Sequence, residues 1–507
     1  MIEKVGIFYF ITFLTHLSSL SFNTQIGDIK KRNLVLIDPD PDDPYGIVTQ
    51  VEGYLENNFG NFIQGKALYS PTFAKELFDN YDLTNDEINE IKENEFNING
   101  LERDFEDICG VLCVSDTGLK TREIFSKTYF KSNVGEGGID YKEARRDKYL
   151  QMEALKMNNV RTMRQILTDD EDEALQFYNH VGANNVDGEE GIVVVKPARG
   201  SASVAVSKCS SRSVLLDKFR STLGVPGYAN GTVSDAILVQ EFLKGEEFAI
   251  DTVSRRGEHK CVANWRYEKK PLNGGDFVYV GTILMEDKEI AYTIPNDNSS
   301  NNINSNIEKR SFSLVDVLND YAISVLNALE ITEGPCHLEV MMTETGPVLI
   351  EANCGRWHVD DFIVLSNLCI GYNAVNVALD ACLSNLIDIL DVEKEPELFQ
   401  CICEAKKRWD AIPIQPQLPY KCHGRILNLW SPTSGILLKT PVRPEVSSLL
   451  RWQPRYSEVG DEVIKTIDLA TDAGWCVLAH HNYEQVVKDS NEICRLQENL
   501  FITKIVE

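Results

Sequence analysis

Short apolar segments follow one another closely from residue 191 onwards, and they constrain the fold more than any other feature of the chain. Each segment ends in turn residues, and several are separated by only a few positions. Runs of this kind predict strands that pair in antiparallel sheets. The six segments are GIVVVKP, SVAVSKC, AILVQEF, EFAIDTVS, KCVANWRY and FVYVGTILM.

The preceding part of the chain predicts strands that alternate with helices. RNLVLIDPD, residues 32–40, has the apolar run of a buried strand and ends in turn residues. The next segment carries Val48, Val51 and Leu55 at helical spacing and ends on Gly60. A second apolar strand, ICGVLCVSD, precedes another predicted helix, TREIFSKTYF. This order indicates an open α/β domain.

With 507 residues, the chain is long enough for several domains, each with its own core. A basic helix is predicted over 141–160 and an amphipathic helix over 313–329, directly before an apolar hairpin. Helical and apolar segments after residue 371 indicate a small α+β unit. We therefore predict a leader or targeting segment at 1–30, an N-terminal α/β domain at 31–140, a central domain at 141–375 and a C-terminal α+β domain at 376–507.

Charge and cysteine content limit the partners and the compartment. A formal net charge of −27 argues against a broad surface for nucleic acid or anionic membrane. The 13 cysteines are scattered without a repeated framework, which indicates mostly free thiols in a reducing compartment. We expect the cytoplasm or an organelle interior.

The first residues leave the question of sorting open. The apolar run at residues 5–14 follows Lys4 and resembles the core of a signal peptide, although it is too short for a comfortable membrane span. The alternatives are a cleaved targeting segment and a partly buried N-terminal helix, and the sequence favours neither. Nothing else in the sequence predicts a stable membrane span.

The hairpin at residues 337–357 carries polar side chains where core residues would be expected. Side chains alternate across a strand, so His337 and Glu339 share one face, and Glu351 and Asn353 share a face of the second strand. Carboxylates that face each other across strands destabilise a sheet unless something neutralises them. Such hard oxygen donors suit Mg²⁺, and the alternative is a solvated sheet face.

Two further motifs suit a nucleotide. In GIVVVKPARGSASVAV, an apolar strand ends at Lys196, and the small residues after it let backbone N–H groups approach phosphate oxygens. In ILVQEFLKGEEFAID, the chain turns at Gly245, where a linker can present backbone groups to a purine and Glu247 can bind ribose hydroxyls. The alternatives are a solvated lysine and an acidic β-turn.

Taken in order along the chain, these motifs resemble those of the ATP-grasp superfamily. The order is a basic helix with Lys148, then Lys196 and its loop, the hinge QEFLKGEEF, Glu339, and the tripeptide EAN. The resemblance covers roughly residues 33–372 and is strongest to carboxylate–amine ligases of the L-amino-acid ligase type. It implies an α/β (α+β) class, with an N-terminal open α/β domain, a two-part nucleotide-binding domain and a small C-terminal α+β domain.

The same resemblance implies roles for individual residues in binding ATP and Mg²⁺, with Mn²⁺ as an alternative ion. Two lysines would hold the phosphates, a loop would cover them, a hinge would bind adenine, and an acid would bind ribose. In that order, these positions are Lys148 and Lys196; Arg199, Gly200, Ser201, Ala202 and Ser203; Glu241, Phe242 and Leu243; and Glu247. The metal ligands would be Glu339, Glu351 and Asn353, and the substrate-side residues would be Arg356, Lys269 and Arg266.

Two departures from the family pattern affect the substrate side. Many relatives have Pro or Ala before the arginine, whereas this chain has Cys354 and Gly355 there and continues with Trp357 and His358. These last two side chains either shape an acceptor pocket or pack beneath the sheet. The small-residue loop also has one glycine where relatives often have two, which puts its mobility in doubt.

The implied activity joins a small carboxylic acid to an amine, with amino acids expected for both, through an acyl phosphate formed from ATP. No base for the amine is apparent in the sequence. The alternatives are an ATP-dependent carboxylase or kinase of the same fold and a non-catalytic nucleotide-binding protein. No nucleic-acid partner is expected, and the oligomeric state stays open.

Overall fold

The structure is a computed structural model of the whole chain. It describes residues 31–37, 47–60, 62–68, 108–113, 121–122, 141–183, 191–200, 205–224, 235–286, 288–292, 310–358 and 361–504. The predicted leader at 1–30, loop residues Ser201, Ala202 and Ser203, and nearly all of the predicted helix TREIFSKTYF lie outside the described residues.

A parallel three-stranded sheet forms the N-terminal unit, with the order β2-β1-β3. The predicted strands and helix are confirmed as β1 (Arg32–Ile37), β3 (Ile108–Cys113) and α2 (Ile47–Phe59), whereas β2 (Ile63–Leu68) was not predicted. Parallel strands buried on both faces are expected to be continuously apolar, as β3 and the last four residues of β1 are.

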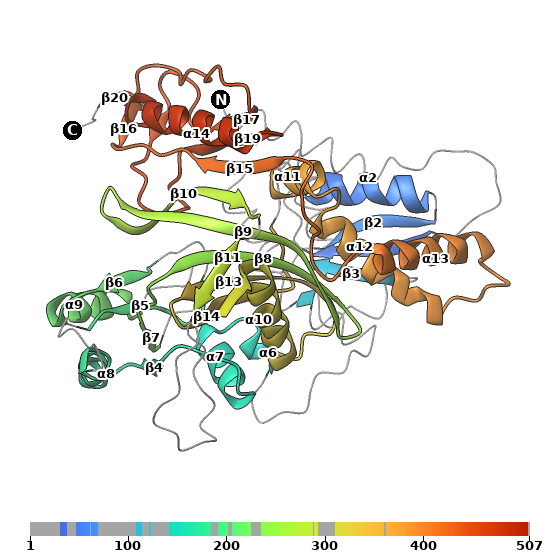
Figure 1. Cartoon of the computed structure of the whole chain (residues 1–507), viewed down its shortest axis with the longest axis horizontal. Helices are drawn as coiled ribbons and strands as arrows, with labels where there is room; N and C mark the ends of the chain where they lie inside the picture. Colours follow the sequence, from blue (N-terminus) through green and yellow to red (C-terminus); the bar gives the residue numbers. More distant parts are fainter. Residues whose placement is uncertain are drawn as a thin grey trace, which may run out of the picture.

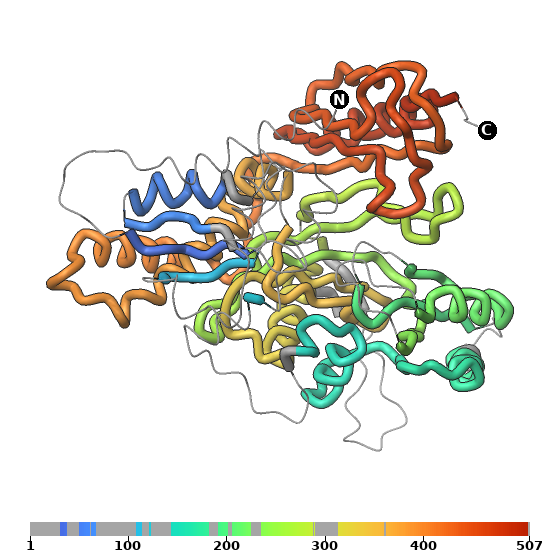
Figure 2. The backbone as a smooth tube through the Cα atoms, turned by 180° about the vertical axis from the view of Figure 1, so that it is seen from behind, coloured from blue at the N-terminus to red at the C-terminus, as the bar shows by residue number. Residues whose placement is uncertain are grey.

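Helices from much later in the chain complete this unit. Figure 1 shows α12 (Ala374–Ser384) and α13 (Pro396–Ala411) beside the blue N-terminal elements, and Figure 2 shows the same from behind. Val375, Leu379 and Trp409 share one buried cluster with Leu34 and Val51. These helices fall within the predicted C-terminal domain, but they pack on the N-terminal sheet. The short helix η1 (Asn385–Asp388) connects them.

The centre of the molecule is an eight-stranded antiparallel sheet with the order β14-β13-β8-β9-β10-β15-β19-β17. The predicted antiparallel pairing is confirmed, and the predicted hairpin forms two adjacent strands at one edge. The last three strands come from the C-terminal unit. The strands are β8 (Glu246–Arg255), β9 (Glu258–Leu272), β10 (Gly275–Leu284), β13 (Gly334–Thr343), β14 (Gly346–Cys354), β15 (His423–Asn428), β17 (Leu449–Pro454) and β19 (Gly474–His480).

A second, smaller antiparallel sheet has the strand order β4-β7-β5-β6. Its buried cluster includes Val193, Val195 and Val239 together with Leu215 and Phe219 from a covering helix. The chain then passes from this sheet directly into the large one, because β7 leads into β8. The elements are β4 (Gln165–Thr168), α8 (Glu171–Ala183), β5 (Val193–Pro197), β6 (Ser207–Cys209), α9 (Arg212–Thr222) and β7 (Ile237–Glu241).

The predicted basic helix at 141–160 is broken into two helices, α6 (Tyr141–Ala144) and α7 (Lys148–Met157). Asp147 caps α7, because its carboxylate accepts hydrogen bonds from the backbone N–H groups of Tyr149 and Leu150 at 3.0 and 3.1 Å. The break therefore places Lys148 at the first position of a helix.

One face of the large sheet is covered by α10 (Leu314–Ala328), as the amphipathic pattern at 313–329 predicts. Leu318, Val325 and Leu326 are buried against Leu338 and Val340 of β13. Ser313 caps the helix by accepting a hydrogen bond from the N–H of Asp316 at 3.0 Å. The short strands β11 (Glu289–Tyr292) and β12 (Arg310–Ser313) pair beside it.

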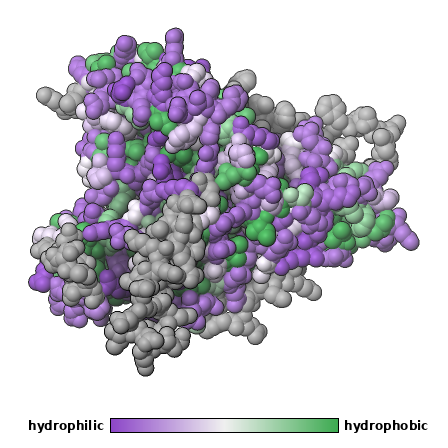
Figure 3. Space-filling model, viewed as in Figure 1, coloured by the Kyte–Doolittle hydropathy of each residue, from purple (hydrophilic) through white to green (hydrophobic). Residues whose placement is uncertain are grey.

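The C-terminal unit combines the last strands of the large sheet with α14 (Tyr483–Leu496) and a small sheet. The face seen in Figure 3 is a mixture in which hydrophilic residues predominate and hydrophobic residues are scattered. Among the described residues, no single helix is long and apolar enough to cross a membrane. The remaining elements are α11 (Asp361–Cys369), β16 (Gly435–Leu437), β18 (Glu462–Val463), η2 (Gln497–Asn499) and β20 (Thr503–Lys504).

Candidate active site

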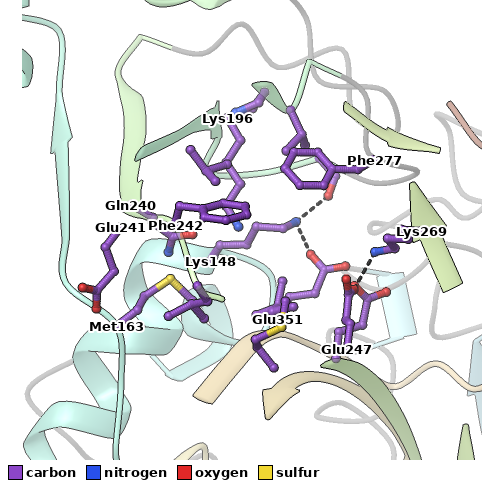
Figure 4. Close-up of a pocket in the computed structure, with 18 residues that line it drawn as sticks. Lys148, Met163, Lys196, Gln240, Glu241, Phe242, Glu247, Lys269, Phe277 and Glu351 are labelled. Carbon is purple, nitrogen blue, oxygen red and sulfur yellow. Dashed lines mark hydrogen bonds and ion pairs between the residues drawn. The ribbon is translucent and has the colours of Figure 1, made fainter. Parts of the chain in front are cut away.

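A partly open cleft lies between the small sheet and the large sheet. Figure 4 shows its lining side chains, which come from α7, both sheets and the segment that joins them. Three lysines and three glutamates point into the cleft, and apolar residues such as Met163, Phe277 and Ile350 line the rest.

Two glutamates meet on the hairpin at one wall of the cleft. The strand register places Glu339 directly opposite Glu351 and places His337 opposite Asn353. The amide nitrogen of Asn353 lies 3.0 Å from Nε2 of His337 and 3.2 Å from Oε1 of Glu351. The amide oxygen of Asn353 is thereby left as the atom that can bind a cation beside the two carboxylates.

Two lysines reach the same place from other elements. Nζ of Lys148 donates to Oε2 of Glu351 at 2.5 Å and to the carbonyl oxygen of Gly200 at 2.6 Å (Figure 4). Lys196, at the end of β5, is only 5% exposed. Its burial, and then the charge of Lys148, lower the pKa of its ammonium to about 8, although Glu351 opposes them. Lys196 therefore lies in a position where an anionic ligand would stabilise its charged form.

A third lysine faces the ribose-binding acid predicted on β8. Nζ of Lys269 lies 2.5 Å from Oε1 of Glu247 and 4.2 Å from the ring centroid of Tyr279. Burial alone would lower the pKa of Lys269, but the carboxylates of Glu247 and Glu339 outweigh it and raise that pKa. Burial would likewise raise the pKa of Glu339, but Lys269 and His337 lower it to about 2. The carboxylate of Glu339 is therefore charged at neutral pH, whereas burial raises the pKa of Glu247 although Lys269 opposes it.

The segment between the two sheets forms a narrow hinge. The N–H of Glu241 donates to the carbonyl of Arg164 at 3.1 Å, and the N–H of Phe242 donates to that of Ile192 at 3.1 Å. Glu241 turns its carboxylate away from the cleft, onto Arg164 (Figure 4). Gly245 follows, and any Cβ there would meet the carbonyl oxygen of Met342 at 2.1 Å. Only glycine lets the hinge run this close to β13.

These residues fit a nucleotide with a divalent ion. Carboxylate and amide oxygens on one sheet face are the donors that Mg²⁺ prefers, and they lie beside lysines that can hold phosphate oxygens. The buried carboxylate pair and the buried Lys196 each need an opposite charge that the cleft only partly supplies. The apolar end of the cleft, with Met163, Leu243 and Ile350, suits a flat base.

Comparisons with solved structures show a similar fold. The L-amino acid ligase of Bacillus licheniformis superposes with a TM-score of 0.55 at 16% identity, covering 94% of this chain and 99% of the other. The biotin carboxylase domain of the 2-oxoglutarate carboxylase of Hydrogenobacter thermophilus, in complex with MgADP, superposes with a TM-score of 0.52 at 12% identity, covering 92% and 90%.

The chain has the ATP-grasp fold. Dapdiamide A synthase of Enterobacter agglomerans is 28% identical over 242 residues, which are 47% of this chain and 49% of that protein. The chain thus matches about half the length of this curated relative. No family model matches the chain.

Within the ATP-grasp fold, the loop after β5 is only partly where the sequence predicts it. Gly200 lines the cleft and binds Lys148 through its carbonyl. In contrast, Nη2 of Arg199 lies 2.6 Å from Oε2 of Glu143 in α6, and its Nε lies 3.1 Å from Oδ2 of Asp147, the residue that caps α7. The structure therefore does not bring Arg199 into the cleft, because two acidic side chains hold it outside.

One predicted substrate-side residue needs correction. Arg266 is three positions from Lys269 on β9, so the two side chains leave opposite faces of the sheet. Arg266 pairs with Glu268 at 3.3 Å and with Glu246 at 3.8 Å on the face away from the cleft. The structure therefore does not bring Arg266 and Lys269 together on one face of the sheet.

Arg356 stays a prediction. Its backbone N–H donates to the carbonyl of Asn353 at 3.2 Å, in a turn where Gly355 has φ +87°. The side chain is half-buried and lies directly after β14, which carries Glu351 and Asn353. This position is compatible with the predicted role facing an acyl phosphate or a substrate carboxylate.

Sequence reasoning missed a buried polar cluster next to the metal-binding edge. Its members are Asp251 of β8, Tyr267 of β9 and His358, which follows β14. A signal was present, because Glu247 and Asp251 alternate onto one face of β8, and Tyr267 and Lys269 alternate onto one face of β9. The position of His358 over that face was not predictable, since it depends on the turn after β14.

Proposed function

We propose that the protein is an ATP-dependent ligase that joins a small carboxylic acid to an amine through an acyl phosphate. The proposal is supported above all by one observation. The paired carboxylates of Glu339 and Glu351 and the ammonium groups of Lys148 and Lys196 converge in one cleft between the two sheets of an ATP-grasp fold.

The residues of the cleft would stabilise charge during the reaction, and none of them would act as a nucleophile. Lys148 and Lys196 would balance the phosphate oxygens while the substrate carboxylate attacks the terminal phosphorus in line. Glu339, Glu351 and Asn353 would hold Mg²⁺, or Mn²⁺ in its place, and the ion would supply electrostatic stabilisation of the transferring phosphoryl group. Arg356 would face the acyl phosphate, because its planar guanidinium suits an oxyanion.

Amino acids are the proposed substrates on both sides. The support comes from the names of two similar proteins, an L-amino acid ligase and dapdiamide A synthase. A small site for the acid and the amine would lie beyond the phosphate end of the cleft, near Arg356 and Lys269.

A reducing compartment is proposed for the protein, because all the described cysteines are free thiols.

A two-substrate screen tests this function. Purified protein is incubated with ATP, Mg²⁺ and pairs of amino acids, phosphate release is measured, and products are identified by mass spectrometry. A ligase releases phosphate and a condensation product only when both partners are present. Glu351→Gln should abolish turnover with an unchanged circular dichroism spectrum, and near-normal turnover in that variant would contradict the metal assignment.

A further inference from the structure

The buried polar cluster beside the metal-binding edge has the connectivity of a proton relay. Oη of Tyr267 lies 2.6 Å from Nε2 of His358. Nδ1 of the same imidazole lies 2.9 and 3.1 Å from the two carboxylate oxygens of Asp251. A carboxylate can only accept, so Nδ1 carries the hydrogen, and Nε2 is free to accept the hydroxyl proton of Tyr267.

Several contacts fix this arrangement. The indole N–H of Trp265 donates to Oδ2 of Asp251 at 2.7 Å, and the backbone N–H of His358 lies 3.4 Å from Oδ1. The imidazole of His358 is stacked between the rings of His337 and Phe362, with centroid distances of 4.3 and 4.2 Å. The imidazole ring of His358 is therefore held in one orientation, with both of its nitrogens hydrogen-bonded.

The cluster adjoins the part of the cleft that is lined by Glu339 and Lys269. In the strand register, Ala249 is the partner of both Glu339 and Trp265, so only a methyl side chain separates the metal-binding edge from the β9 side of the cluster. Tyr267 is also two residues from Lys269 on the same face, and Nζ of Lys269 lies 5.2 Å from its ring centroid. The nucleotide and metal roles assigned above use none of the three relay residues.

Resting on the proposed function, we propose that Tyr267 accepts the proton of the attacking amine, with His358 and Asp251 behind it. Before it attacks, the α-ammonium group of the acceptor gives one proton to the oxygen of Tyr267, while the hydroxyl proton of Tyr267 passes to Nε2 of His358. The free amine nitrogen then bonds to the acyl carbon as the C–O bond to phosphate breaks, and the second N–H proton leaves with the departing phosphate. The imidazolium is balanced by Asp251, and its proton returns to solvent before the next turnover.

The surroundings suit a relay that starts with a neutral imidazole. Burial lowers the pKa of His358, although Asp251 opposes this, so the resting ring is neutral and its Nε2 has a free lone pair. Other titratable groups that face the cluster are Glu339 and His337 on β13, Glu247 on β8, Lys269 on β9 and Tyr279 on β10. In this relay, Tyr267 would be the catalytic residue and His358 would pass the proton on. The alternative is that the cluster is structural and only anchors the chain after β14 to the sheet.

A comparison of two acceptors separates these roles. Hydroxylamine is largely unprotonated at neutral pH and traps acyl phosphates without a base, whereas the α-ammonium group of an amino acid must lose a proton before it attacks. Full-length protein, ATP, Mg²⁺ and an equimolar mixture of amino acids as the acid would be assayed with and without hydroxylamine. Acyl hydroxamate and amide products would both be quantified by mass spectrometry.

Tyr267→Phe keeps the ring and removes the proposed acceptor. Amide formation should fall about 100-fold while hydroxamate formation stays within about threefold of the wild type. The residual amide rate of the variant should rise with pH more steeply than the wild-type rate, because the free amine then forms in solution. His358→Gln should show the same split, and it serves if Tyr267→Phe is poorly folded.

His259→Gln is the matched control. His259 is also buried in the large sheet and hydrogen-bonded, to Ser254 and Asn327, but away from the cleft, so its ratio of amide to hydroxamate should not change. An equal loss of both products in Tyr267→Phe and His358→Gln, or an unchanged amide rate, would overturn the relay and leave the ligase standing. Wild-type protein that forms no hydroxamate would instead overturn the proposed function, and the relay with it.

Discussion

Lys196 carries its charge in a place that disfavours it. Because burial lowers its pKa to about 8, the free protein loses this ammonium as the pH rises through that value. Phosphate binding favours the charged form, so nucleotide affinity should be full below pH 7 and fall by up to about tenfold per pH unit above pH 8.

Calorimetric titration with a non-hydrolysable ATP analogue and Mg²⁺ between pH 6.5 and 9.5 checks this expectation. Lys196→Arg is the control, since a guanidinium stays charged over the whole range and should flatten the profile. An affinity for the wild type that is constant from pH 7 to pH 9 would show that Lys196 does not bind phosphate.

At the scale of single residues, local alternation predicted the most. The convergence of Glu339 with Glu351 and Asn353 needed only the rule that side chains alternate along a strand and the hairpin turn. The ion pair of Glu247 with Lys269 was not predicted, because it depends on the register of β8 with β9. Arg199 could not be placed this way, because Glu143 and Asp147 compete for its guanidinium.

The break between α6 and α7 aims Lys148, and Asp147 maintains it. Asp147→Ala removes a helix cap that stabilises by about 1 kcal/mol, and it also removes one of the two acids that hold Arg199. Lys148 should then lose its fixed direction toward Glu351, so nucleotide affinity should fall severalfold, while Asp147→Asn, which can still cap, should largely restore it.

Asn482→Ala is the comparison for this variant. Asn482 caps α14 by accepting from the N–H of Glu484 at 2.8 Å, far from the cleft. It should cost similar stability in thermal unfolding without any change in nucleotide affinity. Equal affinity losses in Asp147→Ala and Asn482→Ala would mean that the effect is general destabilisation.

At the scale of elements, periodicity predicted the helices and strands, but not their interruptions. The pattern over 141–160 is helical throughout, and only the capping by Asp147 and the contacts of Lys148 with Gly200 and Glu351 favour two helices. β2 was missed because its sequence, IQGKAL, has little apolar periodicity, and its pairing with β1 supplies the stability.

For the molecule as a whole, the structure joins distant parts of the chain. Asp380 of α12 accepts from the hydroxyl of Tyr54 of α2 at 2.5 Å and from Arg408 of α13 at 2.8 Å. This arrangement ties three helices together over more than 300 residues of sequence. Sequence patterns cannot predict it, because each helix is amphipathic without specifying its partner.

Asp380→Ala should lower the stability of this unit by about 2 kcal/mol, a value reduced from that of a fully buried pair because Arg408 stays partly exposed. Urea unfolding followed by fluorescence measures the effect. Asp410→Ala, which removes an exposed ion pair with Lys406 on α13, should change little. At urea concentrations below the unfolding transition, both variants should bind nucleotide with the same affinity. Equal urea midpoints for Asp380→Ala and Asp410→Ala would contradict the stabilising role of Asp380.

The proposed function depends on a divalent ion that the hairpin carboxylates bind next to the phosphates, which the lysines bind. The direct measurement is the affinity for a non-hydrolysable ATP analogue with and without Mg²⁺, in the wild type, in Glu351→Gln and in Glu246→Gln, whose carboxylate is exposed on the other side. We predict that Mg²⁺ tightens binding by about tenfold or more in the wild type and in Glu246→Gln, and little in Glu351→Gln. The same Mg²⁺ effect in all three proteins would contradict the account.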